Sequence, residues 1–200
     1  MEEEDTPTRL QDESAWVKTL IPQLEEAIRE TSTEVLHPKV SDRKRLAYRY
    51  EVSQYSNSGN PKTKATTYQT DVLVWDEMDG DLWIPRVVIE CKLAHLTTHD
   101  AITYSNKAAT HKEVHPYLRY GILIGKLGAK GVPKRLFRHG ASFDFMMVWR
   151  GESASPDEWV RFIEMLRAEI QTSRKIECLI NGKPLDGDNY SLVHRPLVLQ

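Results

Sequence analysis

The sequence predicts an α/β protein in which a mixed central β-sheet is flanked by helices. Three observations support this class. Apolar residues recur at helical spacing from Ser14 to about Val35, two apolar runs flank Asp79-Gly80, and a capping box at Ser155 opens a second amphipathic stretch. The predicted order of elements, α-β-β-β-α-β followed by a C-terminal β-α-β extension, favours one sheet covered by helices.

Length and composition limit the number of domains and the environment. The chain has 200 residues, which suits a single domain over residues 1–200, and its net charge is -2. The protein is not basic overall, so binding to a polyanion must use local patches. Two cysteines, an acidic start and no stretch long enough to cross a membrane predict a cytoplasmic protein without a disulfide framework.

Local patterns predict the individual elements. Residues 1–12 are polar and expected to be flexible, and the helix that follows is interrupted by Pro22. Alternation over residues 48–52 indicates a strand, and residues 56–61 have the composition of a loop. The later elements are expected to be a helix over 99–115, a strand over 120–125, a loop over 126–140, a strand over 143–149, a helix from 155 and a strand or hairpin extension over 176–200.

Residues 70–75 and 87–93 are predicted to pair as a β-hairpin, and three charged residues interrupt their apolar runs. These are Asp71, Glu90 and Lys92. A charge in a buried strand is costly unless it is paired or bound to a metal ion. Because side chains alternate along a strand, Glu90 and Lys92 share one face.

The register of this hairpin decides whether the two acids meet. A two-residue turn places Asp71 opposite Val88 and diagonal to Glu90, whereas a four-residue turn places Asp71 directly opposite Glu90. Either register lets two carboxylates chelate one hard cation, and a slip of one residue separates them. Pro85 cannot donate to the ladder and could mark a bulge, so both registers stay open.

This arrangement resembles the PD-(D/E)xK nuclease superfamily, which includes many restriction endonucleases. The motif is carried by Asp71 and by Glu90-Cys91-Lys92 at the end of the next strand, with Thr70 where the superfamily name has proline. The resemblance covers about residues 14–125 and implies a restriction-endonuclease-like core. It implies a Mg²⁺-dependent endonuclease that hydrolyses phosphodiester bonds of double-stranded DNA, of which a type II restriction endonuclease acting as a homodimer is one form.

The resemblance also implies roles for individual residues. Asp71, Glu90 and the backbone carbonyl of Cys91 would bind Mg²⁺, for which Mn²⁺ can substitute. Lys92 would position the attacking water and stabilise charge in the transition state. Superfamily members often have another acid on the first helix. The candidates are Glu26, Glu30 and Glu34, of which Glu34 is nearest to the sheet in sequence.

A further set of basic and polar residues is predicted to bind nucleic acid. It comprises Lys62 and Lys64 before Asp71, Tyr104 and Lys107 on the helix after Lys92, and Lys130, Lys134 and Arg135 in the glycine-rich loop. The glycines of this loop let its backbone approach phosphates closely. Ordinary solvated charge is an equally open interpretation for these residues.

Two other functions remain open from the sequence: a non-catalytic nucleic-acid-binding protein that keeps the nuclease fold, and an RNA-processing nuclease. A structural ion pair between Lys92 and one carboxylate is the plain alternative to a metal site. That pair leaves the second carboxylate unexplained, which favours the metal site.

Overall fold

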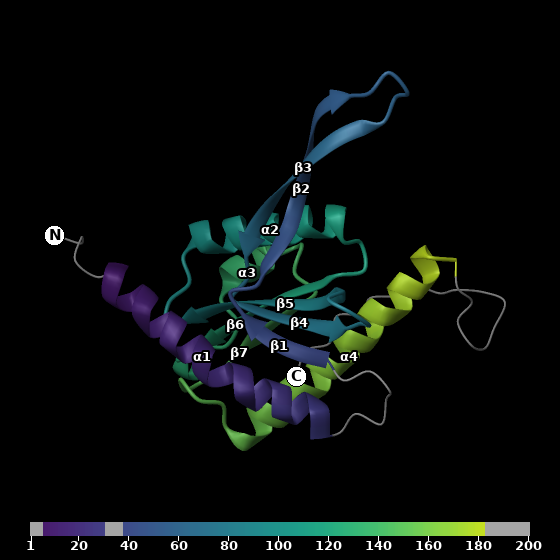
Figure 1. Cartoon of the computed structure of the whole chain (residues 1–200). Coiled ribbons are helices and arrows are strands. Elements are labelled where there is room, and N and C mark those ends of the chain that lie inside the picture. The colour runs from purple at the N-terminus through teal and green to yellow at the C-terminus, as the bar shows by residue number, and fades with distance from the viewer. Residues whose placement is uncertain (1–5, 31–37, 183–200) are drawn as a thin grey trace.

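The structure, a computed structural model, describes residues 6–30 and 38–182 (Figure 1). The helices are α1 (Thr6–Glu30), α2 (Thr98–Val114), α3 (Lys134–His139) and α4 (Pro156–Ile180), with a 3₁₀ turn, η1 (Gly128–Lys130). The strands are β1 (Pro38–Asp42), β2 (Arg45–Tyr55), β3 (Pro61–Gln69), β4 (Val72–Glu77), β5 (Trp83–Leu93), β6 (Arg119–Gly125) and β7 (Phe145–Val148).

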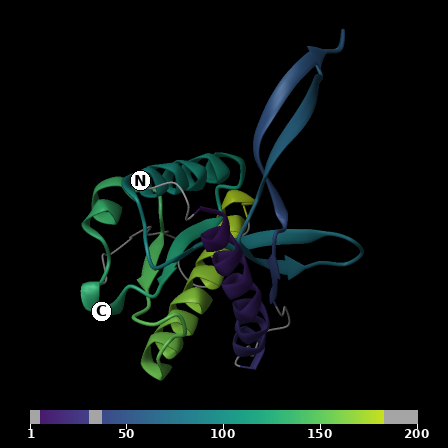
Figure 2. The same cartoon turned by 90° about the vertical axis from the view of Figure 1, so that its left-hand side faces the viewer.

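Five strands form one mixed sheet in the order β1-β4-β5-β6-β7. β1, β4 and β5 pair antiparallel, and β5, β6 and β7 pair parallel. α1 and α4 pack on one face of the sheet and α2 and α3 on the other, so the protein has three layers (Figures 1 and 2). The predicted class, a mixed sheet flanked by helices, is confirmed.

The apolar pattern explains these layers. Every residue of β6 is buried, as expected for a central parallel strand covered on both faces. On α1, Trp16, Leu20, Leu24 and Ile28 recur every fourth residue and form a buried stripe against the sheet. The helix continues through Pro22, which lies on the exposed side.

Three boundaries differ from the predictions. α1 begins at Thr6, so the helix starts before Ser14, where the apolar pattern predicted it. The predicted loop 126–140 contains η1 and α3, because Leu136 is fully buried and gives this short basic segment an apolar side. Residues 176–180 belong to α4 rather than to a strand, and residues 183–200 lie outside the described part of the chain.

The β4–β5 hairpin has the register that brings the two acids together. Val72 pairs with Ile89, so one residue further along Asp71 lies level with Glu90. Of the two registers left open, this is the one expected for the longer turn. The Met78 N–H bonds to the Leu82 carbonyl, so a loop longer than two residues closes the hairpin. The register also shifts between Val74 and Trp75, where Trp75 pairs with Pro85 and leaves a bulge in β5, as the proline suggested.

β2 and β3 form a separate two-stranded ribbon, called the arm below, which projects beyond α2 (Figures 1 and 2). The strand predicted over residues 48–52 lies within β2, but in the arm and not in the main sheet, where the predicted order had placed it. Neither β3 nor β1, which takes that place in the main sheet, was predicted. Hydrogen bonds close the base of the arm. The Arg43 N–H donates to the Thr70 carbonyl at 3.0 Å, and the Thr70 N–H donates to the Lys44 carbonyl at 3.1 Å.

Two histidines fix the base of the arm to α2. His111 Nδ1 and His115 Nε2 lie 3.1 and 3.0 Å from the same acceptor, the Ala47 carbonyl. The His111 ring is also stacked on Tyr120. Burial lowers the pKa of His111 from 6.5 to about 4, and its buried Nε2 has no hydrogen-bond partner among the described residues. His111 is therefore neutral at pH 7.

A buried ionic network joins the hairpin to α4 near the far end of β4. Asp76 is fully buried and binds Arg86 on β5 and Arg174 on α4, each at a shortest distance of 2.6 Å. Arg86 also contacts Glu177 at 2.6 Å. Because each buried charge here has a partner, this network is structural. The sequence alone did not show that these charges are structural, in contrast to the three charges at the other end of the hairpin.

Candidate active site

Asp71 stands just before β4, where the pairing between β4 and β5 ends. Its Oδ2 accepts the backbone N–H of Cys91 at 2.9 Å, so the carboxylate takes the place of a strand partner. The N–H and C=O of one strand residue point to the same side, and the Cys91 carbonyl therefore also faces Asp71. The three predicted metal ligands, Asp71, Glu90 and the Cys91 carbonyl, thus converge at this edge of the sheet.

Glu90 is buried at 3% exposure on the face of the sheet that α2 covers. Its Oε1 accepts the hydroxyl of Tyr120 at 2.5 Å and lies 3.7 Å from Lys107 Nζ. Burial, and next the charge of Asp71, raise the pKa of Glu90 from 4.5 to about 7. Burial likewise raises the pKa of Asp71. The two acids oppose each other's ionisation, and a bound cation would relieve this conflict.

Lys92 extends on the same face as Glu90, and its Nζ lies 3.1 Å from Glu13 Oε2. The ring centroid of Tyr104 is 5.4 Å from the same nitrogen. Burial acts to lower the pKa of Lys92, but its interactions with Tyr104 and Glu13 outweigh burial and raise the pKa above the ordinary lysine value. Lys92 is therefore an ammonium group at neutral pH and can stabilise negative charge but cannot act as a base.

The acid that α1 contributes to the site is Glu13, which the sequence analysis missed. Besides holding Lys92, its carboxylate accepts the backbone N–H of Leu93 at 3.2 Å. Of the predicted acids, Glu26 is exposed on α1, and Glu34 lies outside the described residues, as does the side chain of Glu30. The acid of α1 that contacts this group of residues therefore lies near the start of the helix and is none of the three predicted ones.

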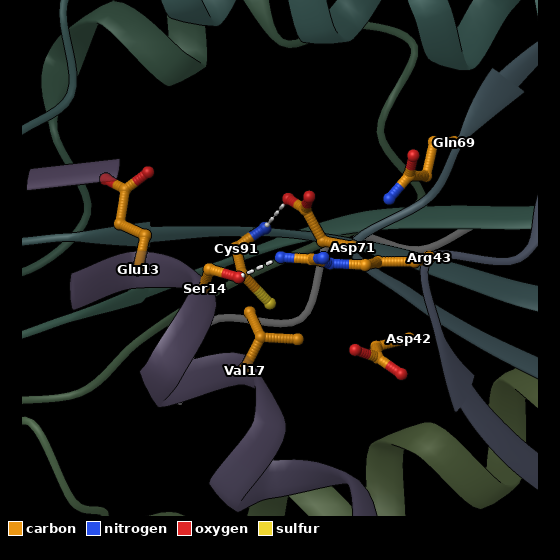
Figure 3. Close-up of a pocket in the computed structure, with 8 residues that line it drawn as sticks. All are labelled: Glu13, Ser14, Val17, Asp42, Arg43, Gln69, Asp71 and Cys91. Atoms are coloured by element: carbon orange, nitrogen blue, oxygen red, sulfur yellow. Dashed lines mark hydrogen bonds between the residues drawn. The ribbon is translucent and has the colours of Figure 1, made fainter. Parts of the chain in front are cut away.

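A pocket of about 210 Å³ opens beside Asp71 at the edge of the sheet (Figure 3). It is lined by Glu13, Ser14, Val17, Asp42, Arg43, Gln69, Asp71 and Cys91. The carboxylates of Glu13 and Asp71 point the same way, away from Val17, whereas the Cys91 thiol points oppositely (Figure 3). Arg43, whose φ is 53°, reaches across and donates to Ser14 Oγ at 2.6 Å. The pocket thus offers both negative and positive groups to a ligand.

The predicted nucleic-acid-binding residues fall into three places. Tyr104 and Lys107 join the site, with Lys107 Nζ 4.8 Å from the Tyr104 ring. Lys62 and Lys64 are exposed on the arm. Lys130 and Lys134 are exposed on η1 and α3, whereas Arg135 Nη1 donates to the Leu96 carbonyl at 2.6 Å and so connects α3 to the segment after β5.

The donor set suits a hard cation. Within the described residues, no three side chains of His, Cys, Asp or Glu form a metal-binding group. Mg²⁺ needs fewer protein ligands, because it is commonly bound by one or two carboxylates while waters and substrate phosphate complete its shell. The two adjacent carboxylates, the buried Glu90 and the half-buried Asp71, fit this requirement together with an oxygen donor from the backbone.

Replacing Glu13 by alanine is expected to lower the free energy of unfolding by about 3 kcal/mol, because it leaves the Lys92 ammonium group largely buried without its carboxylate. Chemical denaturation measures this difference. Glu26→Ala removes an exposed glutamate from the same helix and is the matched control, expected to stay within about 0.5 kcal/mol of wild type. Equal effects of the two substitutions would contradict the role of Glu13.

Comparison with known proteins adds no relative from which a function could be transferred. A scan against protein-family models and a search of curated proteins both found no match to this chain. Among the residues that the structure describes, no helix combines the length and the apolar character needed to cross a membrane. Function can therefore be inferred only from the geometry and chemistry of the site.

Proposed function

We propose that this protein is a Mg²⁺-dependent endonuclease that hydrolyses phosphodiester bonds of double-stranded DNA. The observation that carries the proposal is the pair of adjacent carboxylates, Asp71 and Glu90, beside the protonated Lys92. The element order also supports it. When the arm is left out, α1, β1, β4, β5, α2 and β6 follow the order α-β-β-β-α-β of the restriction-endonuclease-like core that the sequence resembles.

Each residue has a distinct task in this proposal. Asp71, Glu90 and the Cys91 carbonyl would hold the metal ion, which supplies positive charge to the scissile phosphate and acidifies a bound water. Lys92 donates to a phosphate oxygen and stabilises the negative charge that develops during attack. Glu13 is a positioning residue, since its carboxylate holds the Lys92 ammonium group in place.

Two neighbours orient Glu90. The Tyr120 hydroxyl and the Lys107 ammonium group both contact Oε1, which fixes the carboxyl group with its other oxygen turned from these two partners. Both also favour the ionised form of Glu90. They therefore prepare the carboxylate to bind a cation even though burial opposes its charge.

The proposal predicts cleavage of plasmid DNA in Mg²⁺ or Mn²⁺, little in Ca²⁺ and none in EDTA. Gel electrophoresis of a supercoiled plasmid measures it. Asp71→Asn should abolish cleavage, whereas Asp79→Asn, which makes the same change at an exposed position in the hairpin loop, should not. A plasmid that stays intact across metals and sequences would refute the proposal.

Three alternatives are separated when the plasmid assay is run beside an RNA substrate and a DNA-binding measurement. Discrete fragments would identify a sequence-specific restriction endonuclease, whose two-strand cut suits a homodimer. Cleavage of RNA but not of DNA would favour the RNA-processing alternative. Binding to DNA without cleavage of either polymer would favour the non-catalytic alternative.

A further inference from the structure

We infer that the arm formed by β2 and β3 is a DNA-binding element that lies in the major groove beside the site of cleavage. The inference deepens the proposed function and rests on it for the identity of the substrate. It concerns how the duplex is held and at what distance from the carboxylates.

The arm buries little surface within this chain. Every residue from 49 to 65 is exposed, which includes both faces of the ribbon and the turn that connects its strands. A lone two-stranded ribbon is only marginally stable in water, and this one adds nothing to the core beyond its base. Because the base is closed by hydrogen bonds and fixed to α2, the arm is held in one direction for a partner outside the chain.

The two faces of the arm differ in charge. The strand pairing places Arg49 opposite Thr66, Glu51 opposite Lys64 and Gln54 opposite Lys62 on one face, here called the basic face. The other face carries Tyr50, Val52, Thr63 and Ala65. Three cations and one acid gather on the basic face, although the whole chain has a net charge of -2. This local excess of positive charge complements a row of phosphates.

The basic face leads to the site. Tyr68 lies on the same face as Lys62 and Lys64, because these residues are separated by even numbers of positions along β3. The Tyr68 ring centroid is 5.2 Å from Lys107 Nζ, which in turn lies 3.7 Å from Glu90 Oε1. A duplex that follows the basic face therefore arrives at the carboxylates.

The dimensions favour duplex DNA over other polyanions. A two-stranded ribbon fits the major groove of B-form DNA, which is about 12 Å wide, whereas the major groove of A-form RNA is too narrow for one. From Lys62 to Tyr68 the strand spans about 20 Å at its usual rise per residue. This length corresponds to about six base pairs, so the arm should contact DNA about six base pairs from the cut.

The test is the affinity of a triple variant, Arg49→Ala/Lys62→Ala/Lys64→Ala, for a DNA duplex in Ca²⁺. Fluorescence anisotropy at several salt concentrations should give a Kd raised at least about tenfold and a salt slope reduced by about 0.9 for each lost phosphate contact. The matched control is Lys18→Ala/Arg29→Ala/Lys175→Ala. It removes three exposed cations from α1 and α4, across the sheet from α2, and should leave both values unchanged.

The duplex itself provides a second test. Shortening the DNA to less than about six base pairs on one side of the cleavage site should weaken binding to wild type but not to the triple variant. Equal Kd values and salt slopes for the triple variant and its control would overturn the inference. An RNA duplex bound as tightly as DNA would overturn the placement in the major groove.

These outcomes are distinguishable from failure of the proposed function. If wild type binds DNA through the arm but cuts no plasmid in any metal, the nuclease proposal fails and the arm keeps its role. If wild type cuts plasmid and the triple variant cuts with the same KM, the nuclease proposal stands and the arm inference fails.

Discussion

Replacing Lys92 by methionine is expected to slow DNA cleavage by about 10²–10³-fold while DNA affinity stays within a few-fold of wild type. The pKa of Lys92 lies above the ordinary lysine value, so in the proposed reaction it would contribute a fixed positive charge near the phosphate. Methionine keeps the aliphatic packing near Tyr104 and removes that charge. Single-turnover cleavage in Mg²⁺ and anisotropy in Ca²⁺ measure the two quantities separately.

The control for Lys92 is Lys39→Met, which removes an exposed ammonium group that is 4.0 Å from Glu77. It should change neither rate nor affinity. Lys92→Met leaves the buried Glu13 carboxylate without its cation, although the Leu93 N–H still donates to it. The double variant with Glu13→Gln should therefore regain stability but not activity. A double variant that recovers cleavage would show that Lys92 acts on the fold rather than on the reaction.

Replacing Glu90 by glutamine is expected to change how stability depends on pH in the metal-free protein. The pKa of Glu90 is raised from 4.5 to about 7, so the folded protein holds a proton that the unfolded chain releases. The contribution of Glu90 to the free energy of unfolding is therefore greatest below pH 4.5. About 3 kcal/mol of this contribution is lost as the pH rises to about 7. Glutamine cannot ionise and should abolish this loss, leaving the variant the more stable protein at pH 7.

His111 changes the stability of the fold with pH in the opposite direction. The effect of Glu90 must therefore be measured as the difference between wild type and Glu90→Gln. The pKa of His111 is lowered from 6.5 to about 4, and its contribution to stability is present above pH 6.5 and lost as pH falls. Wild type alone can therefore show a nearly flat profile between these values. The difference between wild type and Glu90→Gln, measured by denaturation at each pH, cancels His111 and isolates the carboxyl group.

Metal binding provides the matching prediction at neutral pH. Excess Mn²⁺ should raise the Tm of wild type, because the ion binds the folded site and not the unfolded chain. It should not raise the Tm of Glu90→Gln or Asp71→Asn. If Glu90 or Asp71 merely paired with Lys92, its substitution would destabilise the protein and wild type would not respond to the ion.

The sequence predicts the hairpin and its three charges because these depend on local patterns. The register needed more than that. The shift at the bulge in β5 opposite Trp75 adds to the length of the loop in setting the register, so the turn residues alone left two registers open. Glu13 was missed because an amphipathic stripe is searched for in apolar residues. Glu13 does continue the buried stripe, three positions before Trp16, and an acid inside such a stripe is the signal that could have found it.

Other errors arose where one local signal has two meanings. Asn181-Gly182 resembles a hairpin turn, but here Asn181 caps α4 and Gly182 has a φ of 67°, the usual form of a helix end. The glycines and prolines around α3 likewise favoured a loop, and its one buried residue, Leu136, is too weak a signal to predict a helix. The second strand of the arm was not predicted. Every residue of β3 from 61 to 65 is exposed, so the alternation of apolar and polar residues that identifies a half-buried strand is missing.

Because the base of the arm is closed, changes in the arm can occur without changes in the main sheet. β1 and β4 are neighbours in the sheet. The Arg43 N–H donates to the Thr70 carbonyl and the Thr70 N–H donates to the Lys44 carbonyl, which brings both ends of the arm together at the same point. A short turn could join Asp42 to Thr70 without altering any strand of the main sheet. Under the two proposals above, ribbons of other lengths or sequences at this point would change target preference, while the proposed chemistry of Asp71, Glu90 and Lys92 stays constant.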